Sequence, residues 1–208
     1  MGRGKFISLE GIDGAGKSTH VAYLADLVRG LGHSLVVTRE PGGTPLGEKL
    51  RALVLAEAMH AETETLLMFA ARREHIEQVI LPALERGDWV ISDRFTDASY
   101  AYQGGGRHVS EQKLQQIEAW AVDDLVPDLT LLFDLDPAVA KHRQSTAGMT
   151  PDRFEQQQQI FFDSVRNKYL ARAAAFPKRI KVLDASMPIA AIREQIKTPV
   201  VALEAATT

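Results

Sequence analysis

Short apolar runs alternate with longer segments of helical spacing along this chain. The runs are bounded by turn residues and lie at residues 6–9, 35–37, 89–91, 129–135 and 180–183. Their apolar positions are continuous, which is typical of strands that are buried on both faces of a parallel sheet. The pattern therefore predicts five strands of one parallel sheet.

Helical repeats fill the segments between these runs. In the first repeat, apolar residues recur every three or four positions from Val21 to Leu31, and Gly32 follows as a stop signal. Similar repeats run over residues 66–84, 114–125 and 154–173. Because strands that alternate with helices form βαβ units, we predict an α/β fold with a doubly wound sheet and helices on both of its faces.

No linker or internal repeat divides the chain, so we expect one domain over residues 1–208. In doubly wound sheets, ligands bind beyond the carboxyl ends of the strands. The residues that directly follow the strands are therefore the first candidates for a functional site. The tail after Pro199 is expected to be frayed or peripheral.

The composition argues against several classes of protein. Hydrophobic residues make up 45% of the chain and charged residues 25%, the ordinary mixture of a soluble globular protein. A net charge of −3 without a basic arm argues against bulk binding of nucleic acid. The lack of cysteine excludes disulfides and thiolate metal sites. Neither a signal-peptide segment nor a run of ~20 apolar residues is found, so we expect a cytoplasmic protein without a membrane partner.

A glycine-rich motif separates the first predicted strand from the first predicted helix. Residues 11–18 read GIDGAGKS and fit the P-loop pattern GxxxxGK[ST], in the strand-to-helix context that supports it. Its glycines let backbone N–H groups surround phosphate oxygens, and the helix N-terminus adds partial positive charge. In this motif Lys17 reaches the β and γ phosphates and Ser18 ligates Mg²⁺. We therefore expect a nucleoside-triphosphate site in a fold of the P-loop NTPase type.

A P-loop by itself is compatible with a kinase, a GTPase switch, a motor or a nucleotide-binding scaffold. No N-K-x-D guanine motif occurs, and the chain is short for a motor. A regulatory P-loop protein that phosphorylates no acceptor stays open at this point.

Three further stretches narrow the choice. Residues 39–55 read REPGGTPLGEKLRALVL, residues 66–80 read LLMFAARREHIEQVI, and residues 92–107 read SDRFTDASYAYQGGGR. Together with the P-loop they resemble the thymidylate kinase family, over residues 6 to about 192. The resemblance implies phosphoryl transfer from Mg²⁺-bound ATP to dTMP and a homodimer. A kinase for another nucleoside monophosphate, or for a deoxynucleoside, is the nearest alternative.

The resemblance also implies a set of acceptor-binding residues. They are Asp13, Glu40, Arg51, Phe69, Arg73, Arg94, Ser99, Tyr102 and Gln103. Asp13 matches a carboxylate that contacts the 3′-hydroxyl group of dTMP, and Arg94 and Arg51 match arginines that bind its phosphate. Phe69 matches an aromatic ring that stacks on thymine. Arg73, one helical turn later, matches an arginine that bonds a thymine carbonyl.

The remaining acceptor residues match positions around the base and the sugar. Ser99 and Gln103 match residues that reach the thymine ring. Tyr102 matches a tyrosine that crowds the sugar and disfavours a 2′-hydroxyl group. Glu40 is expected to help organise metal and water, whereas Arg72 is expected to lie at the surface.

On the donor side, the resemblance implies an ATP site and a lid. The implied ATP-binding residues are Gly11, Asp13, Gly14, Ala15, Gly16, Lys17, Ser18, Thr19 and Arg143. Ser18 is expected to ligate the Mg²⁺ ion, and Asp93 is expected either to serve that ion or to orient the lysine. Some members of the family carry an arginine inside the P-loop, but this chain resembles bacterial members that lack it, because the position is Gly14.

A short lid over residues 140–156 would then have to supply the missing cation. In it, Arg143 matches a position near adenine, and Arg153 is expected to reach the transferring phosphate. The catalytic residues expected from the sequence are therefore Lys17, Asp93, Arg94 and Arg153.

Overall fold

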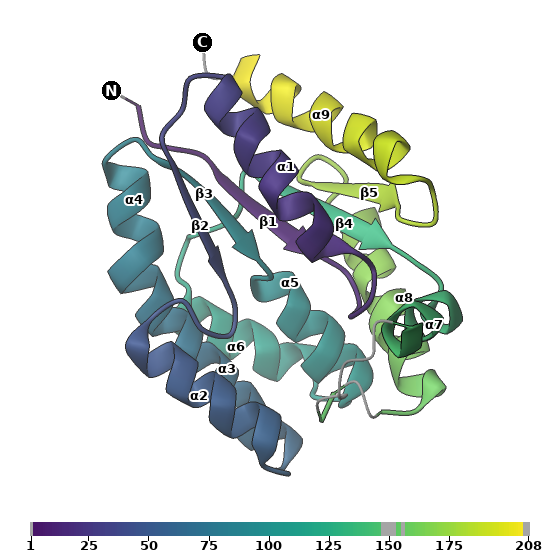
Figure 1. Ribbon diagram of the computed structural model, residues 1–208. Helices are drawn as coiled ribbons and strands as arrows, with labels where there is room; N and C mark the ends of the chain where they lie inside the picture. The colour runs from purple at the N-terminus through teal and green to yellow at the C-terminus, as the bar shows by residue number, and fades with distance from the viewer. Residues whose placement is uncertain (1, 147–152, 155–156, 206–208) are drawn as a thin grey trace.

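A computed structural model describes residues 2–146, 153–154 and 157–205. Its five parallel strands lie in the order β2-β3-β1-β4-β5, which places β1 at the centre (Figure 1). The strands are β1 Phe6–Glu10, β2 Leu35–Arg39, β3 Trp89–Asp93, β4 Leu129–Asp134 and β5 Ile180–Asp184. Each begins at the residue that its apolar run predicted. The predicted doubly wound, five-stranded parallel sheet is confirmed.

Helices cover both faces of this sheet. α1 and α9 lie on one face, and α4 and α8 lie on the other (Figure 1). The helices are α1 Lys17–Gly30, α2 Pro45–Ala56, α3 Ala61–His75, α4 Leu81–Glu85, α5 Thr96–Ser99, α6 Glu111–Ala121, α7 Pro137–Thr146, α8 Gln159–Ala175 and α9 Ile189–Ala205, with π-helical turns η1 Ile76–Ile80 and η2 Tyr100–Gly106. Within the described ranges, none of these helices has the length and apolar character that a membrane span requires.

The helix predicted over residues 66–84 is longer and less regular than its periodicity indicated. It begins at Ala61 and passes through the π-helical turn η1 before it continues as α4. Pro82 lies in the first turn of α4. Because proline has no backbone N–H and its ring crowds the preceding turn, a wider turn before it relieves the conflict.

Residues 96–106 are helical, although the periodicity did not predict a helix there. Three consecutive glycines give this segment a low intrinsic helix propensity. The glycines let η2 lie against α8: a Cβ atom at Gly105 would come within 2.8 Å of the Ser164 carbonyl oxygen, and one at Gly106 within 2.3 Å of the Phe161 ring. Close packing against α8 therefore stabilises a segment that carries several candidate site residues.

Of the two alternatives predicted for the tail after Pro199, a frayed tail is wrong for the residues that the structure describes, whereas a peripheral tail is compatible with side chains that, apart from Val200, are exposed or half-buried. Helix α9 continues through Pro199 to Ala205. Ile192, Ile196 and Val200 form a buried stripe along it. An interior proline costs about 3 kcal/mol, but burial of three aliphatic side chains at about 1.5–3 kcal/mol each offsets this cost.

Candidate active site

The P-loop leaves the central strand β1 and leads into α1. Gly11, Gly14 and Gly16 have φ angles of 137°, 81° and 90°, a region that favours glycine. The Nζ atom of Lys17 donates to the carbonyl oxygens of Gly11 at 3.0 Å and Ile12 at 3.1 Å, so this side chain lies back across the loop. Ser18 and Thr19 are exposed in the first turn of α1. The loop therefore presents N–H groups, a cation and a hydroxyl group to one anion-binding region.

Gly14 faces helix α7 at very short range. A Cβ atom there would lie 2.7 Å from the carbonyl oxygen of Ala140, and the positive φ angle adds backbone strain. In this structure a side chain at this position collides with α7. Residue 14 therefore cannot supply positive charge to this region, and other residues must do so.

Asp93 and Ser18 fit the demands of a magnesium ion. The Oδ1 atom of Asp93 is buried and has no hydrogen-bond partner among the described residues. Ser18 adds an exposed hydroxyl group at the helix N-terminus. Both offer oxygen, which Mg²⁺ prefers, and such an ion usually keeps water and nucleotide phosphates as its other ligands. No cluster of three or more acidic, histidine or cysteine side chains suited to a metal occurs in the described part of the chain.

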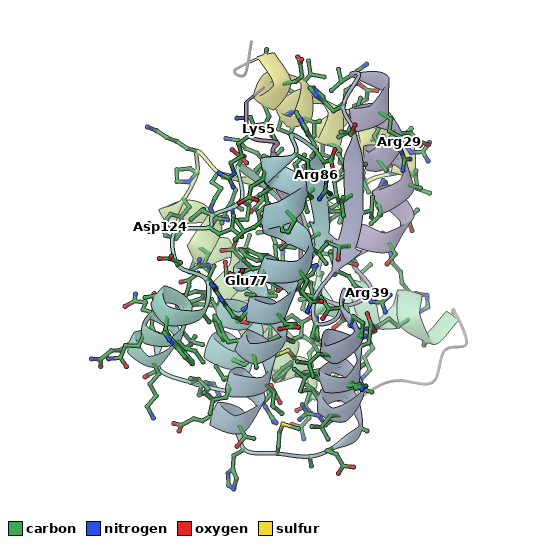
Figure 2. All side chains as sticks on the ribbon, turned by 90° about the vertical axis from the view of Figure 1, so that its left-hand side faces the viewer. Lys5, Arg29, Arg39, Glu77, Arg86 and Asp124 are labelled. Atoms are coloured by element: carbon green, nitrogen blue, oxygen red, sulfur yellow. The ribbon has the colours of Figure 1, made fainter. Side chains whose placement is uncertain are left out.

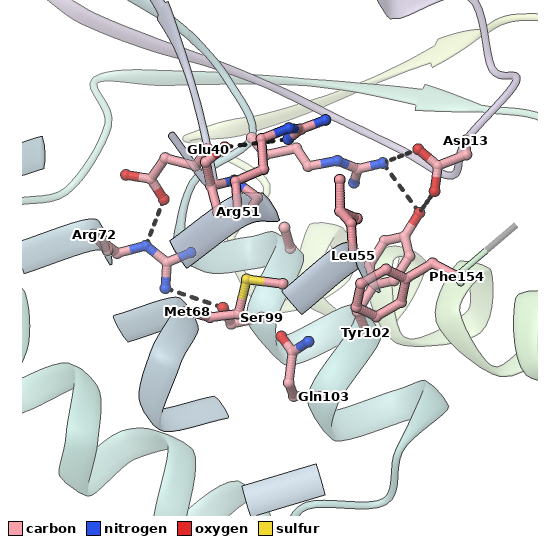
Figure 3. A pocket seen from close by; sticks show the side chains of 13 residues that line it. Asp13, Glu40, Arg51, Leu55, Met68, Arg72, Ser99, Tyr102, Gln103 and Phe154 are labelled. Atoms are coloured by element: carbon pink, nitrogen blue, oxygen red, sulfur yellow. Dashed lines mark hydrogen bonds and ion pairs between the residues drawn. The ribbon is translucent and has the colours of Figure 1, made fainter. Parts of the chain in front are cut away.

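Arg94 connects the end of β3 to the P-loop. Its φ angle of 77° lies in the left-handed region. Its guanidinium group donates to the carbonyl oxygen of Gly11 at 3.1 Å, to the Asp13 carboxylate at 2.6 Å and to the Tyr102 hydroxyl oxygen at 3.1 Å. Tyr102 in turn donates to Asp13 at 2.8 Å, as Figure 3 shows. Burial would raise the pKa of Asp13, but Arg94 and Lys17 lower it to about 2.

A second layer that the sequence did not reveal lies behind Arg94. The hydroxyl oxygen of Tyr169 accepts from Arg94 at 3.1 Å, and Tyr169 donates to the Glu10 carboxyl group at 2.8 Å. The backbone N–H of Phe95 donates to the other Glu10 oxygen at 2.7 Å. Burial, followed by the negative charge of Asp97, raises the pKa of Glu10 to about 8. Tyr169 and Glu10 therefore support the position of Arg94 from inside the protein.

This raised pKa predicts a pH-dependent stability. Because the pKa of Glu10 is about 8 in the folded protein and 4.5 in the reference state, the folded state binds more protons between these values. The free energy of unfolding should therefore fall as pH rises from about 5 to 8, by up to about 1.4 kcal/mol per pH unit from this group. We expect Glu10→Gln to lose that slope, as measured by urea unfolding across this range. Equal slopes in wild type and variant would contradict the prediction.

A pocket opens beside the P-loop, and Asp13 and Arg94 form part of its wall. It encloses about 610 Å³ of space free of atoms, its mouth included. Figure 3 shows its lining side chains, which come from Asp13, Glu40, Pro41, Arg51, Leu55, Met68, Arg72, Arg94, Ala98, Ser99, Tyr102, Gln103 and Phe154. This mixture of apolar walls with a few polar groups is typical of small-molecule sites. The structure thus brings together seven of the predicted acceptor residues: Asp13, Glu40, Arg51, Arg94, Ser99, Tyr102 and Gln103.

Helix α3 presents Met68 and Arg72 to this pocket in place of the predicted Phe69 and Arg73. Phe69 is buried in the core, and Arg73 is 46% exposed and pairs with Glu77. Figure 2 shows Glu77, in the turn η1 that continues α3, on the outside of the molecule. The predicted i, i+4 spacing of an apolar residue and an arginine is therefore correct. The face of α3 that meets the pocket, however, is shifted by one residue from the predicted face.

The prediction that Arg72 lies at the surface is wrong, because only 3% of it is exposed. It donates to the Glu40 carboxylate at 2.6 Å and to the Ser99 hydroxyl oxygen at 3.0 Å. The other Glu40 oxygen lies 2.9 Å from the Nδ1 atom of His75. Glu40 thus orients two neighbouring side chains, and its expected part in organising metal and water stays a prediction.

The structure places the two expected lid cations at separate points. Arg153 donates to the carbonyl oxygen of Val54 at 3.0 Å and to the Glu64 carboxylate at 2.5 Å. Arg143 donates to the carbonyl oxygen of Ala185, directly after β5, at 3.1 Å. Residues 147–152 and 155–156 of the expected lid lie outside the described residues.

A P-loop on the central strand of a parallel sheet, with an arginine-lined pocket beside it, defines the class of P-loop nucleotide kinases. The family model for thymidylate kinase matches residues 9–196. The chain belongs to the thymidylate kinase family.

Individual relatives resemble the chain over almost its whole length. The thymidylate kinase of Bordetella petrii is 56% identical over 201 residues, which cover 97% of each chain. That of a Janthinobacterium species is 58% identical over 204 residues and covers 98% of this chain and 100% of its own. The crystal structure of thymidylate kinase from Ehrlichia chaffeensis matches with a TM-score of 0.75 and 32% identity, over 97% of this chain and 99% of that one.

Proposed function

We propose that this protein transfers the γ-phosphoryl group of ATP to dTMP, yielding ADP and dTDP. One observation carries the proposal: the pocket shares Asp13 and Arg94 with the wall of the P-loop region. A donor and an acceptor bound on either side of these residues would have their phosphates next to each other. Phosphoryl transfer depends mainly on such positioning and on neutralised charge. Membership in the thymidylate kinase family supports the same reaction.

On the donor side, Lys17 and the N–H groups of the P-loop hold the β and γ phosphates. Ser18 and Asp93 would hold Mg²⁺, which would neutralise charge on the nucleotide phosphates. Burial and the charge of Arg94 lower the pKa of Lys17 to about 8, so most of this group is still charged at neutral pH. A general base is not needed for a loose transition state.

On the acceptor side, Arg94 and Arg51 bind the phosphate of dTMP. Arg51 lies at the pocket edge, where it donates to the carbonyl oxygen of Pro41 at 3.1 Å. Asp13 accepts the 3′-hydroxyl group, and Tyr102 packs against the sugar and disfavours a 2′-hydroxyl group. Both side chains already contact each other and Arg94, so little reorganisation is required.

For the base, we assign Arg72 and Met68 the positions that the sequence assigned to Arg73 and Phe69. Arg72 would bond a carbonyl group of thymine, and Met68 would pack on the ring, because both line the pocket. Ser99 and Gln103 lie on the same wall and complete the polar contacts.

The rotation of α3 predicts opposite results for two adjacent arginines. Arg72→Ala should raise the KM for dTMP by roughly 10- to 150-fold, since a hydrogen bond from a charged donor is worth about 1.5–3 kcal/mol. The KM for ATP should change little. Arg73→Ala is the matched control and should leave both constants within about two-fold. Steady-state kinetics on folded variants measures these constants. A raised KM for dTMP in Arg73→Ala, together with an unchanged KM in Arg72→Ala, would show the assignment to be wrong.

A coupled ADP-release assay tests the proposed reaction. ADP release that depends on dTMP is the expected result, whereas release at the same rate without it would indicate a regulatory P-loop protein. An acceptor series of dTMP, dUMP, UMP, dCMP and thymidine then identifies the substrate. The reaction consumes ATP, so we also propose that the protein acts in the cytoplasm.

We further propose a homodimer, as the family resemblance implies. α3 and α6 pack together, and each carries a large exposed apolar side chain: Leu66 is 58% exposed and Trp120 is 83% exposed. A second copy of the chain would bury such exposed apolar side chains. Light scattering after gel filtration should give a dimer for the wild type and a monomer for Trp120→Glu.

A further inference from the structure

We infer that Glu64 is a specificity-determining positioning residue: it fixes the side-chain amide of Gln103 so that its oxygen faces the base. The inference rests on the proposed function and extends it to a residue outside the pocket lining. Glu64 lies on α3, two residues before the motif at residues 66–80 that pointed to the site. Its role follows from three contacts and from the chemistry of a carboxylate.

The carboxylate of Glu64 is fully buried and joins three donors from two segments: Gln103 and Arg107 of η2 and its C-terminal cap, and Arg153. One oxygen, Oε1, accepts from the Nε2 atom of Gln103 at 2.9 Å. The other, Oε2, accepts from Arg107 at 3.1 Å and from Arg153 at 2.5 Å. The two guanidinium groups offset the buried negative charge, as such a site requires. They also occupy Oε2, which leaves Oε1 for Gln103.

This arrangement decides which end of the Gln103 amide faces inward. A carboxylate only accepts hydrogen bonds, whereas a glutamine side chain has a donor end and an acceptor end. The end that meets Glu64 must therefore be the NH₂ group, and the amide orientation follows from the network itself. Gln103 lines the pocket, where Figure 3 shows its amide, so the oxygen is the atom left to meet a ligand.

An inward-facing acceptor selects among pyrimidines. Thymine and uracil carry an N–H group at ring position 3, between two carbonyl groups, and this group can donate to the Gln103 oxygen. Cytosine has an unprotonated nitrogen there, so two acceptors would face each other. Arg72, on the same wall, supplies a donor that suits a carbonyl group and not the amino group of cytosine. A site built for one hydrogen-bond pattern rejects the wrong pattern strongly, because buried groups are left unpaired.

The variant Glu64→Gln tests the inference directly. Arg107 would hold the new amide oxygen also when Arg153 has left for the phosphate, so its NH₂ group would face Gln103 and turn the Gln103 oxygen away from the base. The kcat/KM ratio of dTMP to dCMP should fall by about 10- to 100-fold. The ratio of dTMP to dUMP should stay within two-fold, because both bases carry the same N–H group. General loosening of the pocket would not produce this split, and Glu62→Gln, an exposed carboxylate on the same helix, is the matched control.

A double-mutant cycle shows whether Glu64 acts through Gln103. In a Gln103→Met background, Glu64→Gln should change the dTMP to dCMP ratio by less than two-fold. An undiminished effect there, or an unchanged ratio in folded Glu64→Gln, would overturn the inference.

A binding measurement on the wild type tests the contact between Gln103 and the ring N–H, on which the inference depends, even if Glu64→Gln does not fold. Calorimetry with 3-methylthymidine monophosphate, which lacks the ring N–H, should show at least 10-fold weaker binding than dTMP. Equal binding of the two would overturn the inference. This result does not depend on turnover: if the wild type bound dTMP selectively but released no ADP with it, the proposed reaction would fail and the orientation assigned to Gln103 would stand.

Discussion

Replacing Lys17 with methionine should lower kcat by about 10³-fold while the protein stays folded. Removal of one preorganised donor from a transition state typically costs 10²- to 10³-fold, and Lys17 also carries a full charge at the transferring phosphate. Its Nζ atom already contacts the carbonyl oxygens of Gly11 and Ile12, so the cation is held in place before nucleotide binds. Methionine keeps most of the apolar length of the side chain.

ADP release at saturating ATP and dTMP measures this loss, and thermal unfolding checks the fold. Lys49→Met, an exposed lysine on α2, is the control and should keep at least half of the wild-type rate. The affinity of the wild type for ATP should also fall above pH 8, because the pKa of Lys17 is about 8 and an anion binds the protonated form. Lys17→Met should lack that decline. Near wild-type kcat in the variant would remove Lys17 from the mechanism.

The second large effect concerns Arg153. We propose that it contacts the transferring phosphate, which requires it to leave the Glu64 carboxylate and the Val54 carbonyl group. Arg153→Ala should then lower kcat by on the order of 10²–10⁵ and change either KM little, since the contact strengthens in the transition state.

Arg143→Ala is the comparison variant for this prediction. Arg143 contacts Ala185 after β5, away from the pocket lining, and we propose that it lies near adenine. Its loss should mainly raise the KM for ATP. If Arg143→Ala abolished turnover and Arg153→Ala did not, the two roles would be exchanged. If neither lowered kcat, the cation over the γ-phosphate would come from Lys17 and Arg94.

Local patterns in the sequence were sufficient for the sheet, the P-loop and most of the pocket. Apolar runs marked where all five strands begin. The reason, burial on both faces, holds for the inner strands β1, β3 and β4, whereas the edge strands β2 and β5 are partly exposed. The P-loop and the residues after β3 lie at strand ends, where a parallel sheet collects its ligand contacts. Asp13, Arg94 and Tyr102 could therefore be expected to lie near one another before any contact was known.

The sequence could not determine in this way which face of α3 meets the pocket. Met68 with Arg72 and Phe69 with Arg73 have the same spacing, so helical periodicity supports both pairs equally. Contacts from distant segments decide between them: Glu40 after β2 and Ser99 after β3 bind Arg72.

The buried residues that support the site from behind, Glu10, Tyr169 and Glu64, depend on tertiary structure even more strongly. Glu10 and Tyr169 are 159 residues apart in the chain, and Glu64 meets Arg153 across 89 residues. Nothing in the local sequence around Glu10, Glu64 or Tyr169 distinguishes them from ordinary strand and helix positions. A buried carboxyl group acquires its role only when the folded chain excludes water and brings it a donor, so that role is decided by packing and not by the sequence pattern.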